Sequence, residues 1–138
     1  MDRKMKKSLN CILLIDDNED DNFFHKRVIM KSGLVSNVVE KKSGEEALEY
    51  LKMRADHPEI IFLDINMPGM SGWEFLEEYQ KLPKLDQSKI VIVMLTTSTN
   101  PDDREKAGKL KKIAKYKTKP LTVPILEGII KSYFHDVE

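Results

Sequence analysis

Short runs of apolar residues recur along the chain and are separated by longer segments of mixed polarity. Three of the four strong runs show no alternation of polar and apolar positions, which is typical of strands buried on both faces of a sheet. The strong runs lie at residues 11–15, 35–40, 60–64 and 90–95. A weaker run at 114–118 ends just before Lys119 and Pro120. The pattern therefore predicts five strands.

The segments between these runs carry the signals that begin helices. Ser43 with Glu46 three residues later forms a capping-box pattern, and Asn100 before Pro101 provides an N-cap and a proline at the first helical position. A first helix is expected at about residues 20–31, with Gly33 ending it. Apolar residues follow at helical spacing in the other four: Ala47, Leu48 and Leu51; Trp73, Leu76 and Tyr79 after Ser71; Ala107, Leu110 and Ala114; and Leu126, Ile129, Ile130 and Tyr133.

Strands and helices thus alternate along 138 residues, a length that suits one domain. Alternation of this kind predicts an α/β fold, in which a five-stranded parallel sheet carries five helices on its two faces in a doubly wound arrangement. We divide the chain into a basic N-terminal segment, 1–9, and a folded domain, 10–138. In such folds ligands bind beyond the carboxyl ends of the strands.

Composition narrows the choice of function. The chain has 23 basic and 23 acidic residues, which gives no general attraction to nucleic acid or to a membrane surface. No apolar run approaches the roughly 20 residues needed to span a bilayer, and no signal peptide is recognisable, so we expect a cytoplasmic protein. The single cysteine, Cys11, is predicted to be a small buried residue. The histidines, His25, His57 and His135, lack the spacing of metal ligands and are predicted to lie on the surface.

Acidic residues stand where two predicted strands end. Asp16 and Asp17 follow the first apolar run, and Asp64 closes the third. Charges about 4 Å apart repel by roughly 1 kcal/mol in water and about 4 kcal/mol at an effective dielectric constant near 20, so such carboxylates raise their own pKa values or bind a cation. Oxygen ligands favour a hard divalent ion, Mg²⁺ first, with Mn²⁺ or Ca²⁺ as substitutes. A metal ion held by these carboxylates, the hydroxyl of Thr96 and the ammonium of Lys119 would together form a site for an anion such as a phosphoryl group.

The segments LLIDDN, IIFLDINMPGMSGWEFL, VIVMLTTS and YKTKPL, in this order, resemble the receiver domain of two-component response regulators. The resemblance extends from about Asn10 to Phe134 and implies a CheY-like, flavodoxin-like fold. It also implies a role for each matching residue: Asp64 as phosphoacceptor, Asp16 and Asp17 as ligands of Mg²⁺, Asn66 as a further ligand through its backbone carbonyl, Thr96 and Tyr116 as switch residues, Lys119 as the partner of a phosphoryl oxygen, and Pro120 as the residue after a cis peptide bond.

The same resemblance implies a function in a phosphorelay. Asp64 is expected to take a phosphoryl group from a sensor histidine kinase or a histidine phosphotransfer protein, in a self-catalysed reaction rather than as a turnover enzyme. Output is expected to pass by protein contact through the fourth helix, fifth strand and fifth helix. Because few residues follow the last helix, we expect a stand-alone domain, a monomer or weak phosphorylation-dependent dimer, with no nucleic-acid or membrane partner.

Other interpretations stay open at the level of sequence. Taken singly, the strand-end acids could be helix caps or turn residues, and Asp20 and Asp21 suit the N-terminal dipole of the first helix. The lysines between positions 109 and 119 form either a docking surface for an acidic partner or a solvated helix face. A haloacid dehalogenase-type phosphatase also uses a strand-end aspartate, but Asn66 stands where that class has a second acid. An adaptor that keeps the fold without the chemistry is a third alternative.

Two positions depart from the common pattern of receiver domains. The approach to Lys119, KLKKIAKYKTKPL, contains no glycine, so the turn after the fourth helix is expected to be shaped differently from that of many receivers. Thr97 is larger than the residue often found there, and with Asn66 it is expected to tune how water reaches the acyl phosphate. The first departure is expected to affect the output surface more than the phosphoryl site.

Overall fold

The computed structural model describes residues 9–53, 57–82 and 87–134. Five strands form one parallel sheet: β1 (Leu9–Ile15), β2 (Val35–Lys41), β3 (Ile60–Leu63), β4 (Val91–Thr96) and β5 (Ile113–Thr118). Their order across the sheet is β2-β1-β3-β4-β5, so the chain moves first to one edge and then turns back past β1 to the other. The predicted five-stranded α/β class is confirmed.

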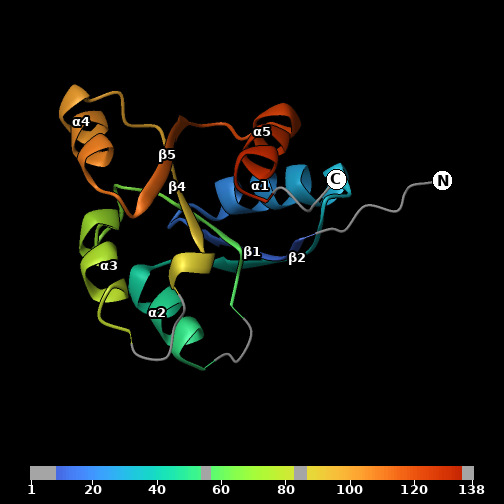
Figure 1. Ribbon diagram of the computed structural model, residues 1–138. Helices are drawn as coiled ribbons and strands as arrows, with labels where there is room; N and C mark the ends of the chain where they lie inside the picture. Colours follow the sequence, from blue (N-terminus) through green and yellow to red (C-terminus); the bar gives the residue numbers. More distant parts are fainter. Residues whose placement is uncertain (1–8, 54–56, 83–86, 135–138) are drawn as a thin grey trace.

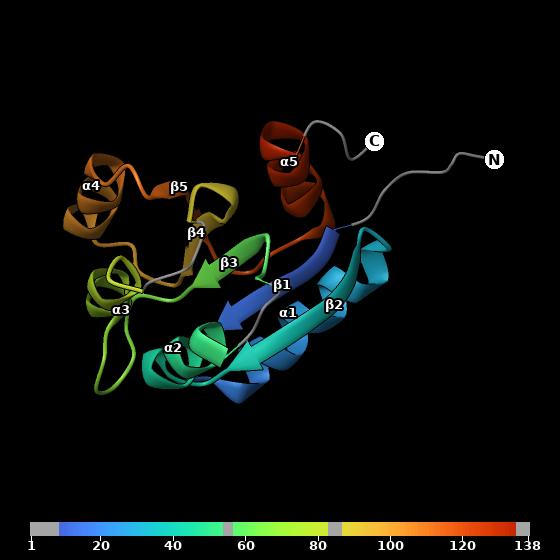
Figure 2. The ribbon, with the colours of Figure 1, turned by 60° about the horizontal axis from the view of Figure 1, so that its bottom comes forward.

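Five helices cover the two faces of this sheet. They are α1 (Glu19–Ser32), α2 (Gly44–Met53), α3 (Gly72–Tyr79), α4 (Pro101–Lys109) and α5 (Val123–Tyr133), and a short 3-10 helix, η1 (Gln87–Lys89), leads into β4. Helices α1 and α5 lie on one face, whereas α2, α3 and α4 lie on the other (Figure 1, Figure 2). Within the described residues, no helix has the length and apolar character that crossing a membrane requires.

The register of the two central strands determines what meets at the edge of the sheet. Burial on both faces explains the unbroken apolar runs of β1 and β3. Ile15, the last residue of β1, is paired with Leu63, the last residue of β3. The next residues, Asp16 and Asp64, therefore leave the sheet side by side, at the point where the strand order reverses.

Each face of the sheet has its own apolar cluster. On the face of α2, α3 and α4, the rings of Phe75 and Tyr79 stack with centroids 5.8 Å apart, and both side chains are 1% exposed or less. Other buried members of that cluster are Leu13, Ala47, Leu51, Ile61 and Met94. On the opposite face the cluster includes Leu14, Ile29, Phe62, Leu126 and Ile129. These two clusters hold the helices against the strands. The polar residues at the carboxyl ends of the strands belong to neither cluster.

Side chains at the helix ends account for most of the boundaries. The side chain of Asn18 accepts a hydrogen bond from the backbone of Asp21 and begins α1. Ser71 and Glu74 form a complete capping box at the start of α3. Gly33 adopts a left-handed conformation with φ of 73° and ends α1, as the sequence predicts.

Helix α4 is shorter than the sequence pattern predicts. It ends at Lys109, Leu110 is its C-cap, and Ala114 already belongs to β5. The predicted stripe of Ala107, Leu110 and Ala114 is therefore wrong, and only Ala107 is a buried residue of the helix. The physical reason is the extended backbone of Leu110, with φ of −97° and ψ of 115°, which turns the chain toward the sheet so that β5 can pair with β4.

The prediction of surface histidines is wrong for His25. Its side chain is 3% exposed, because α1 directs Asn22, His25 and Ile29 toward the sheet. Helical geometry then leaves the neighbouring Phe23 61% exposed. Burial, and secondarily the charge of Lys119, lowers the pKa of His25 below its ordinary value.

Three other side chains are buried to a different extent than predicted. Cys11 is half-buried rather than buried, with its sulfur 3.8 Å from the hydroxyl of Tyr50. Tyr133, placed on the apolar stripe of the last helix, is 39% exposed and donates a hydrogen bond to the carbonyl of Ala114. His57 is half-buried, and His135 lies outside the described residues.

Candidate functional site

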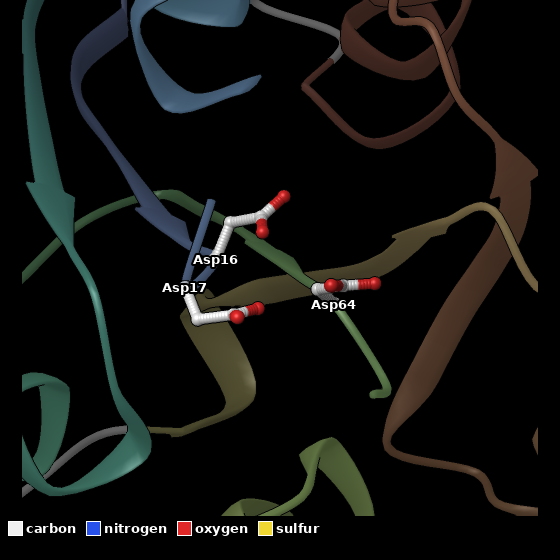
Figure 3. Close-up of side chains that lie close together, drawn as sticks. All are labelled: Asp16, Asp17 and Asp64. Carbon is white, nitrogen blue, oxygen red and sulfur yellow. The ribbon is translucent and has the colours of Figure 1, made fainter. Parts of the chain in front are cut away.

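Three carboxylates gather at the carboxyl end of the sheet. Asp16 and Asp17 follow β1, and Asp64 follows β3, as Figure 3 shows. Each offers one oxygen, and these three oxygens lie within 4.8 Å of one another. Asp16 and Asp64 are buried, whereas Asp17 is exposed and opens the cluster to solvent. The predicted acidic cluster is therefore present in the structure.

Backbone groups hold the two buried carboxylates in position. Asp16 accepts a hydrogen bond from the backbone N–H of Asn18 at 3.0 Å, and its own carbonyl accepts one from the Asn22 side chain at 2.9 Å. Asp64 accepts a hydrogen bond from the N–H of Ile65 at 2.9 Å. The second oxygen of each carboxylate makes none of these backbone contacts, and both face the ammonium of Lys119, at 2.6 Å for Asp16 and 3.8 Å for Asp64.

Lys119 brings the positive charge of the site. Its ammonium lies 2.6 Å from Asp16 and 2.7 Å from Asp21, but 3.8 Å from Asp64. The backbone places it, because the N–H of Lys119 donates to the carbonyl of Thr96 at 2.9 Å. The peptide bond between Lys119 and Pro120 is cis, as the resemblance to receiver domains implies.

The neighbouring charges and burial shift the pKa values of Asp64 and Lys119. Burial, and then the charge of Asp16, raises the pKa of Asp64 to about 6, although a hydrogen bond from Thr96 and the charge of Lys119 oppose the rise. Burial alone would lower the pKa of Lys119, but hydrogen bonds to Asp16 and Asp21 outweigh it and raise the pKa above its ordinary value. The ammonium therefore stays charged at neutral pH, and the carboxylate of Asp64 is more basic than that of an ordinary aspartate.

The donor set fits a hard divalent cation. It consists of carboxylate oxygens alone, it carries a surplus of negative charge, and through Asp17 it reaches solvent, which allows Mg²⁺ to keep several waters. Asn66 is exposed and lies two residues beyond Asp64. The role of its backbone carbonyl as a further ligand stays a prediction.

Thr96 and Tyr116 are joined through one loop. Thr96 is fully buried at the end of β4, and its hydroxyl lies near enough to Asp64 to oppose the rise in the pKa of that carboxyl. Its hydroxyl oxygen accepts from the N–H of Ser98 at 3.3 Å, and the carbonyl of Ser98 accepts from the hydroxyl of half-buried Tyr116 at 3.1 Å. The guanidinium of Arg104 in α4 stands 4.7 Å from the centre of the Tyr116 ring. A displacement of Thr96 can therefore reach α4 and β5.

Sequence reasoning missed two residues of the site. A Cβ at Gly72 would lie 2.5 Å from the carbonyl oxygen of Asp64, so α3 approaches the site through a position that only glycine fits. In the sequence, the only indication of this glycine's role is that Ser71 and Gly72 directly precede a helical pattern. Asp21, assigned only to the dipole of α1, also pairs with Lys119, and no local signal reveals a partner 98 residues away.

Comparison with known families identifies the chain. The response regulator receiver domain matches residues 12–131, a span that includes every strand-end residue described above. The chain therefore belongs to the response regulator receiver domain family, whose members act in two-component signalling. This confirms the family that the sequence motifs resemble.

The chain is also similar to individual proteins and solved structures. A probable cyclic di-GMP phosphodiesterase of Vibrio cholerae is 30% identical over 135 residues, which cover 96% of this chain but 28% of that protein. Response regulator Rcp1 of Synechocystis is 32% identical over 97 residues, 67% of this chain and 65% of that protein. The chain thus spans less than two thirds of either relative. A crystal structure of a two component response regulator from Cytophaga hutchinsonii matches with a TM-score of 0.85 and 30% identity, over 94% of this chain and 99% of that one.

Proposed function

We propose that the protein is a phosphoacceptor that takes a phosphoryl group on Asp64 from a phosphohistidine of a sensor kinase or of a histidine phosphotransfer protein. One observation carries the proposal: Asp64 lies beside two other acids, Asp16 and Asp17, and beside the ammonium of Lys119 and the hydroxyl of Thr96. Transfer of a phosphoryl anion needs a nucleophile close to positive charge. Lys119 carries such a charge, and the acids would supply more by holding a divalent cation. Membership of the receiver family supports the same conclusion.

Asp64 acts as the nucleophile. One oxygen of its carboxylate attacks phosphorus, the bond from phosphorus to the imidazole nitrogen breaks, and that nitrogen keeps the electron pair while the imidazole takes up a proton. The product is an acyl phosphate on Asp64. Since a pKa of about 6 leaves most of the carboxylate ionised at neutral pH, no general base is needed.

The surrounding residues neutralise the charge that is transferred. Asp16, Asp17 and Asp64 are proposed to hold Mg²⁺, together with the backbone carbonyl of Asn66. When bound, this cation supplies positive charge to the phosphoryl oxygens and to the carboxylates. Lys119 donates to one phosphoryl oxygen and Thr96 to another. Hydrolysis later reverses the modification: the oxygen of a water molecule attacks phosphorus, the bond between phosphorus and the carboxylate oxygen of Asp64 breaks, and the protons of the water pass to the phosphate and to solvent. Inorganic phosphate leaves, and Asp64 is again a free carboxylate.

Output is proposed to begin at Thr96. When its hydroxyl turns from the carboxylate of Asp64 to a phosphoryl oxygen, the loop that contains Ser98 moves with it, and the hydrogen bond from Tyr116 to Ser98 changes partner or length. Because Arg104 packs over the ring of Tyr116, the surface of α4, β5 and α5 changes. We propose that a downstream protein reads this surface. A cytoplasmic location suits a partner of histidine kinases.

A small phosphodonor tests the proposal without knowledge of the kinase. The wild type, incubated with acetyl phosphate and Mg²⁺, is expected to gain the mass of one phosphoryl group, and the gain is expected to vanish with chelator or in Asp64→Asn. Asp20→Asn, an exposed acid that lies outside the cluster, is the control and is expected to react as the wild type does. No adduct in the wild type, or an equal adduct in Asp64→Asn, would remove the proposal in favour of an adaptor. Turnover of many phosphate esters would instead favour a phosphatase.

A further inference from the structure

We propose that Asp21 is the resting partner of Lys119 and restrains the site from accepting a phosphoryl group, an inference that rests on the proposed function of Asp64. Two carboxylates, Asp16 and Asp21, hold the ammonium of Lys119 at 2.6 and 2.7 Å, whereas Asp64 stands 3.8 Å away. In the resting site the lysine is therefore engaged with groups other than the phosphoacceptor. Two of its three N–H donors are taken up by these carboxylates, so giving up one of them leaves the ammonium freer to donate to a phosphoryl oxygen on Asp64.

Exposure indicates which partner the lysine gives up. The side chain of Asp16 is 7% exposed, so water has little access to replace the ammonium there. The side chain of Asp21 is 36% exposed, and Asp21 lies in the first turn of α1, where the helix dipole favours a negative charge. Water can hydrate Asp21 once the ammonium leaves, so breaking this ion pair costs little. Asp21 is thus the contact that can be exchanged for a phosphoryl oxygen.

The charge of Asp21 also acts on the incoming group. Its carboxylate adds a fourth negative charge beside those of Asp16, Asp17 and Asp64, and it compensates part of the positive charge that Lys119 would otherwise present. A phosphoryl donor arrives as an anion and is repelled by this surplus. Removal of the charge of Asp21 is therefore expected to make the resting site more receptive to phosphoryl anions and to leave the metal ligands themselves in place.

Two neighbouring substitutions separate this role from a general effect of charge. Asp21→Asn and Asp20→Asn each remove one acid from the first turn of α1, and both side chains keep the same size. Asp20 is exposed, so its variant reports the loss of helix-dipole and long-range charge alone. The affinity for Mg²⁺ is measured by calorimetry, the affinity for beryllofluoride by titration at saturating Mg²⁺, and the rate of phosphorylation with acetyl phosphate.

Asp21→Asn is expected to bind beryllofluoride about fivefold more tightly, and to be phosphorylated about fivefold faster, than Asp20→Asn, as the loss of one partly exposed ion pair allows. The Mg²⁺ affinities of the two variants are expected to agree within about twofold, because Asp21 is not proposed as a metal ligand. In a Lys119→Ala background the difference between the two variants is expected to disappear, since Asp21 acts through the lysine.

Several results would overturn the inference. Equal beryllofluoride affinity in Asp21→Asn and Asp20→Asn would show that Asp21 does not restrain Lys119, and weaker binding in Asp21→Asn would show that it positions the lysine productively instead. A difference that persists without Lys119 would also overturn it. Each of these results leaves the proposed function intact when the wild type still binds beryllofluoride, whereas no binding in the wild type would overturn the proposed function and the inference together.

Discussion

The body of the sheet and its carboxyl end obey different physical rules. In the body, residues such as Leu13, Ile61 and Phe75 are fully buried among apolar neighbours, and each contact stabilises the fold. At the carboxyl end, Asp16 and Asp64 are almost as deeply buried, yet they are like charges that repel one another. The difference teaches that burial stabilises the fold where side chains are apolar, whereas at the carboxyl end it disfavours the charged form of Asp64. Loss of an apolar side chain should accordingly destabilise the body, whereas loss of a buried charge should stabilise the site.

The largest effect is expected in the body. Phe75→Ala removes a ring with 0% exposure that stacks on Tyr79, so the free energy of unfolding should fall by about 3 to 5 kcal/mol. Urea denaturation followed by circular dichroism measures the change. Phe75→Leu, which keeps most of the apolar volume, is the control and should lose clearly less. A loss below about 1 kcal/mol for the alanine variant would mean that α3 is not held as the structure indicates.

Gly72 marks the border between the two regions. In Gly72→Ala the new Cβ would meet the carbonyl of Asp64 at 2.5 Å, so the backbone must shift, and we expect a loss of about 1 to 3 kcal/mol together with slower phosphorylation. Gly108→Ala in α4 is the matched control, because nothing lies within 4 Å of its added Cβ. That variant should be unchanged or stabilised by up to about 1 kcal/mol, as helix propensity predicts. Similar behaviour of the two variants would contradict the close approach of α3.

The site itself should become more stable when its charge is removed. Because the pKa of Asp64 is raised to about 6 in the folded protein, the ionised carboxylate destabilises the fold at any pH above that value. In the absence of Mg²⁺, Asp64→Asn is expected to gain about 1 to 2 kcal/mol at pH 8. The gain should shrink as the pH falls through 6 and disappear below about 3.8, where the wild-type carboxyl is protonated in both states. Thermal melts across this pH range measure it, and a gain that did not depend on pH would contradict the assignment.

The hydroxyl of Tyr79 is a polar group within the apolar body of the sheet, and it extends the comparison of body and site. The hydroxyl of Tyr79 is buried and has no hydrogen-bond partner among the described residues, and burial raises its pKa. Tyr79→Phe should therefore leave the stability unchanged or raise it by up to about 1 kcal/mol. Tyr133→Phe is the control, because it removes a hydroxyl that donates to Ala114 and should cost a few tenths of a kcal/mol. A large loss in Tyr79→Phe would reveal a partner for this hydroxyl.

Most of the fold follows from local patterns. Unbroken apolar runs identify β1, β3 and β4, and the caps at Asn18, Ser71 and Gly33 are local interactions that short segments of sequence encode. The end of α4 could not be predicted in this way. Leu110 and Ala114 continue the helical spacing, but the pairing of β5 with β4 overrides it, and that pairing is a tertiary contact.

The site was predictable where it follows the ends of strands and unpredictable where it depends on packing. Asp16, Asp64, Thr96 and Lys119 come together because parallel strands end at one edge. Asp21 and His25 lie on α1, and only the rotation of that helix on the sheet determines that one reaches Lys119 and the other is buried. Helical periodicity in α1 is weak because its exposed face carries Phe23, so the sequence did not indicate which face of this helix packs on the sheet.

The central claim is that phosphorylation occurs at Asp64 rather than at the other acids of the cluster. The direct measurement is to phosphorylate the protein with acetyl phosphate and Mg²⁺, reduce the acyl phosphate with borohydride, and sequence the peptides by mass spectrometry. Reduction converts an aspartyl phosphate to homoserine, and we predict this conversion at position 64 alone. Conversion at Asp16 or Asp17, or no conversion in a protein that is folded and saturated with Mg²⁺, would contradict the account.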